Sequence, residues 1–229
     1  MKRICRYLPI LSLLLLCVPF ASAQSSVDFM LGFGTAHDKA NANGLDNTDL
    51  SQCSPIGSIG ASSGGTCQAT PGLGGFFLGI GGDAMLWKHF GIGAEVNVQP
   101  AKSTLITSVY GPVQYRQTFY DFNAIYAPVN TKRATLQLQG GPGGAKTGLS
   151  INQNTCVGSA CLSQSSPLVN ANHFQIHGGV GVSIFVSEHI FIRPQFDIHY
   201  VPNFTSQPGF GSNLVLAATV WVGYNFGDR

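Results

Sequence analysis

Charged residues are scarce in this sequence, since Asp, Glu, Lys and Arg together make up 10% of its 229 residues. Soluble domains usually have about a quarter. The 12 basic and 10 acidic residues nearly cancel, so the chain lacks the basic field that nucleic-acid binding requires. A chain so poor in charge has a large apolar surface that water does not reach or long neutral loops. With 29 glycines in the sequence, we expect both.

Long hydrophobic runs are also missing beyond the N-terminus. The most apolar later stretch, Leu214–Val222, is far shorter than the ~18 residues of a transmembrane helix. If the chain resides in a membrane, it must therefore cross with strands that close into a barrel, because lipid offers no hydrogen-bond partner to an open sheet edge.

The N-terminus has the features of a secretory signal peptide. An apolar stretch runs from Leu8 to Phe20, and a small-residue cleavage site ends at Ala23, which makes Gln24 the first mature residue. A lipid-anchored Cys17 is the alternative, which the bulky residue before it disfavours. Cleavage removes three of the basic residues, leaving nine against ten acidic ones. The basic residues removed with the peptide are Lys2, Arg3 and Arg6.

Apolar and polar residues alternate with a period of two in much of the remaining chain, as in strands that have two different faces. In the segment from Phe90 to Val98, for example, the apolar residues alternate with Gly91, Gly93, Glu95 and Asn97. Pro194 is unusual inside a strand and predicts a local bulge. The eight segments that we expect to be strands are 27–33, 72–84, 90–98, 113–126, 134–140, 174–186, 190–200 and 214–226.

The predicted connections differ in length on the two sides of such a barrel. Those at 85–89, 127–131 and 187–189 are short, and the others are long, as in outer-membrane barrels with short periplasmic turns and long extracellular loops. A soluble sandwich or a secreted lipocalin-like binding barrel is the alternative. Its polar faces would carry many Lys and Glu residues, whereas Gly, Gln, Asn and Ser predominate here. Aromatic residues predicted near the short-turn boundary are Trp87, Phe90, Tyr126, Tyr224 and Phe226.

The last predicted strand, Thr219-Val-Trp-Val-Gly-Tyr224-Asn-Phe226, together with the signal peptide and eight alternating segments, resembles the OmpA/OmpX-type eight-stranded outer-membrane proteins. The resemblance implies one all-β domain over residues 24–229, an antiparallel up-and-down transmembrane barrel in the bacterial outer membrane. It also implies contact with outer-membrane lipid and lipopolysaccharide. Thr219, Tyr224 and Phe226 match the family's C-terminal signal for the barrel-assembly machinery. Trp221 replaces the signal's glycine, and three further residues follow Phe226.

Four cysteines remain after the signal peptide, two in each of two long predicted loops. Local pairing of Cys53 with Cys67 and of Cys156 with Cys161 is the simplest of three connectivities, and the oxidising periplasm favours disulfides. A bridge between the loops is the main alternative. We predict no metal site and no cofactor.

Strand parity places several titratable side chains inside the predicted barrel. Because an eight-stranded barrel is filled by its own side chains, buried charges must pair, with Arg193–Glu95 and Arg193–Asp197 as candidate pairs. A plug of ion pairs and hydrogen bonds is the favoured interpretation, and a narrow gated pore is the alternative. The predicted lumen network consists of Glu95, Asp121, Arg133, His177, Arg193, Asp197 and His199.

Enzymatic activity is the hypothesis from another class, because some eight-stranded barrels modify lipid A. The deacylase type resembles His-x-Ser on a strand, but His199 is followed by Tyr200 and Val201. No nucleophile stands beside its base, so we predict no catalytic residue. The sequence predicts a non-enzymatic protein whose loops serve envelope integrity or bind an extracellular ligand.

Overall fold

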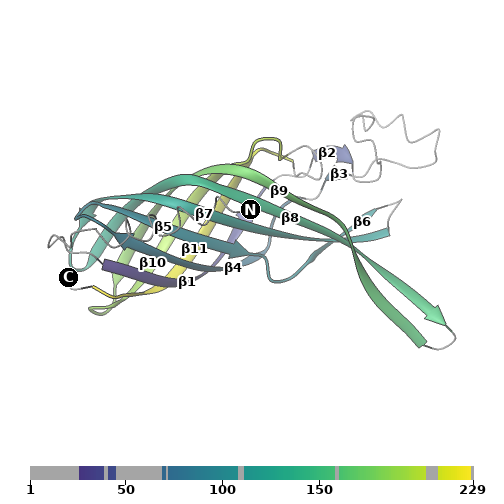
Figure 1. The fold of residues 1–229 in the computed structure, drawn as a ribbon, viewed down its shortest axis with the longest axis horizontal. Helices are drawn as coiled ribbons and strands as arrows, with labels where there is room; N and C mark the ends of the chain where they lie inside the picture. The colour runs from purple at the N-terminus through teal and green to yellow at the C-terminus, as the bar shows by residue number, and fades with distance from the viewer. Residues whose placement is uncertain are drawn as a thin grey trace, which may run out of the picture.

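The computed structural model describes residues 26–38, 41–44, 69–70, 72–107, 111–157, 160–204 and 211–227. Within them, eight antiparallel strands form a closed barrel, because β1 pairs with both β4 and the last strand, β11 (Figure 1). The predicted fold class is confirmed. The barrel strands are β1 (Ser26–His37), β4 (Phe76–Met85), β5 (Phe90–Val98), β7 (Gly111–Asn130), β8 (Ala134–Val157), β9 (Ala160–Phe185), β10 (Ile190–Tyr200) and β11 (Leu214–Asn225), and shorter strands are β2 (Asn41–Gly44), β3 (Ala69–Thr70) and β6 (Ser103–Thr107).

The alternation of residue types becomes an alternation of faces. In β10 every second side chain, from Phe191 to His199, is buried, and those between them are exposed. The exposed set contains large apolar side chains on all eight strands, and the buried set contains most of the polar and charged side chains. This arrangement inverts a soluble core, as expected for a barrel whose outer wall faces lipid.

Two strands extend well beyond the others. β8 and β9 pair from Ala134 and Ile184 at the turn end to Val157 and Ala160, with one register shift between Leu149 and Ser150, and the resulting hairpin projects past the barrel (Figure 1). The prediction that residues 141–173 form a loop was wrong. The glycine run in β8 concealed the alternation: Gly144 faces the ring of Tyr120 on β7, where a Cβ atom would overlap that ring.

The predicted bulge at Pro194 was also wrong. The pairing of β10 with β11 is continuous through Pro194, and its register with β9 is the same on either side of this residue. Pro194 and Arg193 are simply left out of the pairing with β9. Because proline has no backbone N–H, the pairing with β9 is interrupted at this point, but the register of the strand does not change.

The turn end of the barrel has exposed aromatic side chains on its outer wall. Trp87 is 62% exposed in the turn between β4 and β5. Nearby aromatic pairs are Phe90 with Tyr126, whose ring centroids are 5.1 Å apart, and Tyr224 with Phe226, at 4.8 Å. All five predicted girdle residues therefore lie on the outer surface. No helix in the described residues is long and apolar enough to cross a membrane.

Apolar clusters fill the interior at both ends of the barrel. Toward the turn end, Trp221 packs with Met30 and Phe191, and its indole ring lies against Gly32 and Gly79, where side chains would overlap it. The larger cluster lies toward the loop end and comprises Ala36, Leu73, Phe77, Val113, Tyr115, Phe119, Ala145, Leu149, Val201, Phe204 and Val215. Most of the other buried side chains of the interior are polar, and Arg193 among them is the register partner of Trp221.

Candidate functional site

Arg193 forms the central ion pair of the lumen. Its side chain is 0% exposed, and its Nη1 lies 2.7 Å from Oδ2 of Asp83. Its Nη2 lies 3.7 Å from Oδ2 of Asp28, and its Nε donates to Ser183 Oγ at 3.0 Å. Asp28 and Asp83 are register partners on β1 and β4, so two carboxylates stand side by side opposite one guanidinium.

The predicted pairing of Arg193 with Glu95 or Asp197 was therefore wrong. The alternation of side chains along each strand predicted that all three lie inside, and all three are buried. However, the alternation does not specify which strands face each other across the lumen. Asp28 and Asp83 had inward parity in the sequence, and only the β1–β4 register brings them together.

Glu95 and Asp197 instead share two amide groups. Gln139 Nε2 donates to Glu95 Oε1 and to Asp197 Oδ1, both at 3.2 Å. Gln195 Nε2 donates to Glu95 Oε2 and to Asp197 Oδ2, both at 2.9 Å. Asn123 Nδ2 adds a bond of 3.2 Å to Glu95 Oε1. The sequence alone does not mark these amides as network residues, because Gln and Asn alternate with apolar residues in any solvent-facing strand as well.

A second polar group surrounds Asp121 closer to the loop end. Gln175 Nε2 donates to Asp121 Oδ1 at 2.6 Å, and the Nδ1 atoms of His177 and His199 lie 3.1 Å and 3.7 Å from the same oxygen. His199 also stacks on Phe119, with centroids 5.0 Å apart. The structure thus brings Asp121, His177 and His199 together beneath the apolar cluster at the loop end.

Arg133 does not belong to this network, and its predicted lumen position was wrong. It is exposed in the turn between β7 and β8, one residue before β8 begins at Ala134. Thr131 fixes this turn, since its Oγ1 donates to Ala134 O at 2.7 Å. The odd-numbered side chains of β8 point into the lumen, but this alternation does not extend into the turn before the strand. Among the described residues, no group of three or more His, Cys, Asp or Glu side chains is arranged to hold a metal ion.

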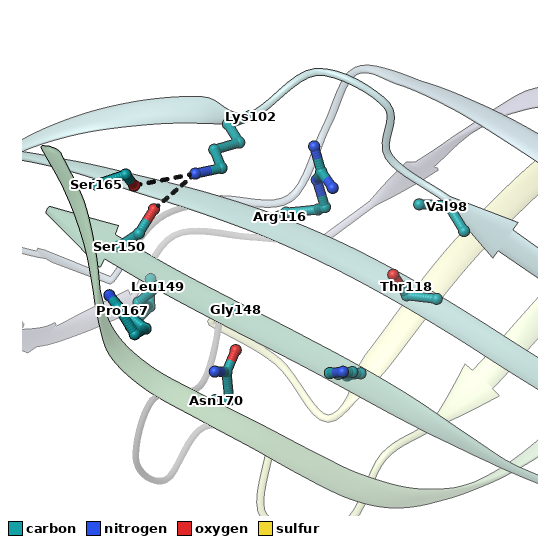
Figure 2. Close-up of a pocket in the computed structure, with 11 residues that line it drawn as sticks. Val98, Lys102, Arg116, Thr118, Gly148, Leu149, Ser150, Ser165, Pro167 and Asn170 are labelled. Carbon is teal, nitrogen blue, oxygen red and sulfur yellow. Dashed lines mark hydrogen bonds between the residues drawn. The ribbon is translucent and has the colours of Figure 1, made fainter. Parts of the chain in front are cut away.

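A second candidate site lies on the outer wall at the loop end. Residues of β5, β7, β8 and β9 and of the segment after β5 line a hollow of about 400 Å³. Figure 2 shows Lys102 and Arg116 among the side chains that line it. Lys102 Nζ donates to Ser150 Oγ at 3.0 Å and to Ser165 Oγ at 3.5 Å. The lining is Val98, Lys102, Arg116, Thr118, Lys146, Gly148, Leu149, Ser150, Ser165, Pro167 and Asn170. We name this hollow the outer basic pocket.

The remaining predicted residues are located only in part. Cys156 and Cys161 are directly opposite each other in the β8–β9 register, whereas Cys53, Cys67, Ala23 and Gln24 lie outside the described residues. In β11, Thr219 is buried inside the barrel, and Tyr224 and Phe226 at its end are exposed.

A closed barrel with an apolar outer wall and a polar interior defines the class of transmembrane β-barrels. The model of the "Outer membrane protein beta-barrel domain" family matches residues 8–226, so this chain belongs to that family. The protein is therefore an outer-membrane protein with transmembrane strands. No curated protein matches the chain.

Solved structures similar to this chain are also outer-membrane proteins. The attachment invasion locus protein Ail of Yersinia pestis is 10% identical, with a TM-score of 0.46 over 89% of this chain and 99% of Ail. Neisserial surface protein A is 11% identical, with a TM-score of 0.44 over 89% and 96%. A major outer membrane protein from Thermus thermophilus is 10% identical, with a TM-score of 0.47 over 87% and 99%.

Proposed function

We propose that this protein is a non-conducting outer-membrane barrel that acts through its extracellular surface, in envelope integrity or in binding. The observation that carries the proposal is the lumen. Arg193 is fully buried between Asp83, Asp28 and Ser183, and two apolar clusters occupy other parts of the interior. Opening a water path would separate a buried ion pair, which costs several kcal/mol.

Single-channel recording on the refolded protein tests this function against the narrow gated pore. We expect no sustained openings in a planar bilayer from a sample shown to be folded by its gel mobility. Sustained openings that change in Arg193→Met, but not in the turn variant Lys132→Ala, would contradict the proposal. Lys132 is a suitable control because it is exposed in the turn between β7 and β8, away from the lumen.

We propose no enzymatic role. The contacts of the two buried histidines support this view: His177 bonds with Asn123 at 2.5 Å and lies beside Asp121, and His199 stacks on Phe119. These contacts hold an interior together and do not orient a base toward a nucleophile. Mass spectra of lipid A with and without expression of the protein test this proposal, and an altered acyl pattern would contradict it.

The route to the membrane and the ties within the loops are part of the same proposal. The signal peptide ending at Ala23 would carry the chain to the periplasm, and the barrel-assembly machinery would insert it through the strand that ends at Phe226. Disulfides in the oxidising periplasm would restrict the segments that meet external partners.

A further inference from the structure

The outer basic pocket concentrates positive charge on one side of the barrel. Lys102, Arg116 and Lys146 line it, and all three are exposed. They come from the segment after β5, from β7 and from β8, so the pocket exists only because the barrel brings these elements together. Figure 2 shows Lys102 and Arg116 on the same side of the sheet as the polar side chains of Ser150, Ser165 and Asn170.

No acidic side chain balances this charge in the described part of the chain. Six of its seven acidic residues are buried, each 5% exposed or less. The seventh, Glu188, is in the turn between β9 and β10 at the opposite end of the barrel. Exposed cations held together without a counter-charge repel each other, and an anionic ligand relieves that repulsion.

The position of the pocket identifies the source of the anion. Lys146 lies on the outer face of β8, two residues beyond Gly144, which is the register partner of Phe174. Phe174 is 58% exposed and belongs to the apolar outer wall. Two residues of a strand rise about 7 Å along its axis, so Lys146 lies just past this exposed apolar residue, where we infer that the lipid headgroups begin.

The lining supplies the donors that a phosphate group needs. Arg116 presents a guanidinium, which matches phosphate oxygens in a fork, and Lys102 and Lys146 add ammonium groups. Thr118 and Asn170 are further hydrogen-bonding groups in the lining. Arg116 Nη2 is held by the carbonyl oxygen of Pro100 at 3.1 Å, which orients the side chain without neutralising it.

We propose that the outer basic pocket binds the phosphate groups of an anionic glycolipid in the outer leaflet, that is, of lipopolysaccharide. This proposal deepens the surface role proposed above, since it names the chemistry of one partner. The pocket then serves as a fixed contact between the barrel wall and the headgroup layer.

Binding of purified lipopolysaccharide to the detergent-solubilised full-length protein tests the proposal. The probes are the phosphorylated lipopolysaccharide, the same preparation after enzymatic dephosphorylation, and inorganic phosphate alone. We expect the triple variant Lys102→Ala/Arg116→Ala/Lys146→Ala to bind the phosphorylated form at least ~10-fold more weakly than the unmodified protein, since each lost charge-assisted bond contributes. We expect dephosphorylation to weaken binding to the unmodified protein by a similar factor.

A matched control removes three cations from the other end of the barrel. Lys88, Lys132 and Arg133 are exposed in the short turns, and their triple Ala variant should bind as the unmodified protein does. Equal affinity for both forms of the lipid, or an equal loss in the two triple variants, would overturn the proposal. Tighter binding of a soluble sulfated polysaccharide than of the lipid would overturn the lipid source. Conductance is measured separately, so failure here leaves the proposed closed lumen unaffected.

Discussion

At the scale of single residues, Trp221 explains why two glycines stand on neighbouring inner faces. Gly32 on β1 and Gly79 on β4 leave the space that its indole ring occupies. Trp221 stands where the C-terminal signal of OmpA/OmpX-type proteins has a glycine, and the two glycines opposite it let a large ring pack there.

We predict that Gly79→Ala destabilises the barrel, because its Cβ atom would lie 2.5 Å from the Trp221 ring. Overpacking of this kind costs about 1–3 kcal/mol. Urea titration of the protein folded in lipid vesicles measures the loss. The double variant Gly79→Ala/Trp221→Leu should recover part of it, and an additive effect of the two substitutions would contradict the packing argument.

We predict a larger effect for Arg193→Met, which leaves Asp28 and Asp83 buried without their cation. Removing one partner of a buried pair costs about 3–5 kcal/mol. The same urea titration measures the change, with Lys132→Met in the turn as a control that should stay within about 0.5 kcal/mol. If Asp28→Asn/Asp83→Asn added to Arg193→Met failed to restore stability, the loss would not come from uncompensated charge.

At the scale of elements, the accuracy of the sequence predictions depended on the residues between the apolar positions. The predicted bounds of 90–98 and 190–200 coincide with β5 and β10, whose outward apolar residues alternate with polar or small ones except at Phe191. In β8 and β9 the apolar residues end where the wall leaves the lipid, and a two-sided polar ribbon has no period of two to detect. The partners of Arg193 could not be predicted for another reason. Contacts across the lumen depend on which strands face each other once the barrel has closed.

The projecting part of the β8–β9 hairpin should be dispensable for folding. It lies beyond the barrel (Figure 1) and contributes no residue to the polar network. We predict that replacing residues 152–164 with a two-residue turn leaves the unboiled protein as compact on a gel as the full-length chain. A shift to the unfolded mobility would show that the hairpin stabilises the barrel.

The same hairpin offers a direct test of one cysteine pair. Residues opposite each other in a sheet have Cβ atoms about 4.5–5.5 Å apart, near the range that a disulfide spans. We predict a Cys156–Cys161 bond in protein isolated from outer membranes, detected by peptide mass spectrometry without reduction. A peptide linking either residue to Cys53 or Cys67 would instead establish the bridge between loops.

At the scale of the whole molecule, closure should make the fold resistant to detergent. Every barrel strand has a partner on both sides along its transmembrane part, so no edge is left for SDS to enter. We predict that the unboiled protein from outer membranes migrates faster in SDS gels than the boiled protein. Recovery of the protein only from a soluble fraction would contradict its residence in the outer membrane.

The contact between the two ends of the described chain bears on how the barrel is made. Asn225 on the last strand donates a hydrogen bond to Asp28 on the first, and both side chains are buried. Asp28 is also one of the two acids that surround Arg193. Before the last strand is added, Asp28 therefore lacks the hydrogen bond from Asn225, although it already belongs to the group around Arg193. A partly assembled barrel is less stable for this reason, and insertion is expected to proceed to completion or to reverse.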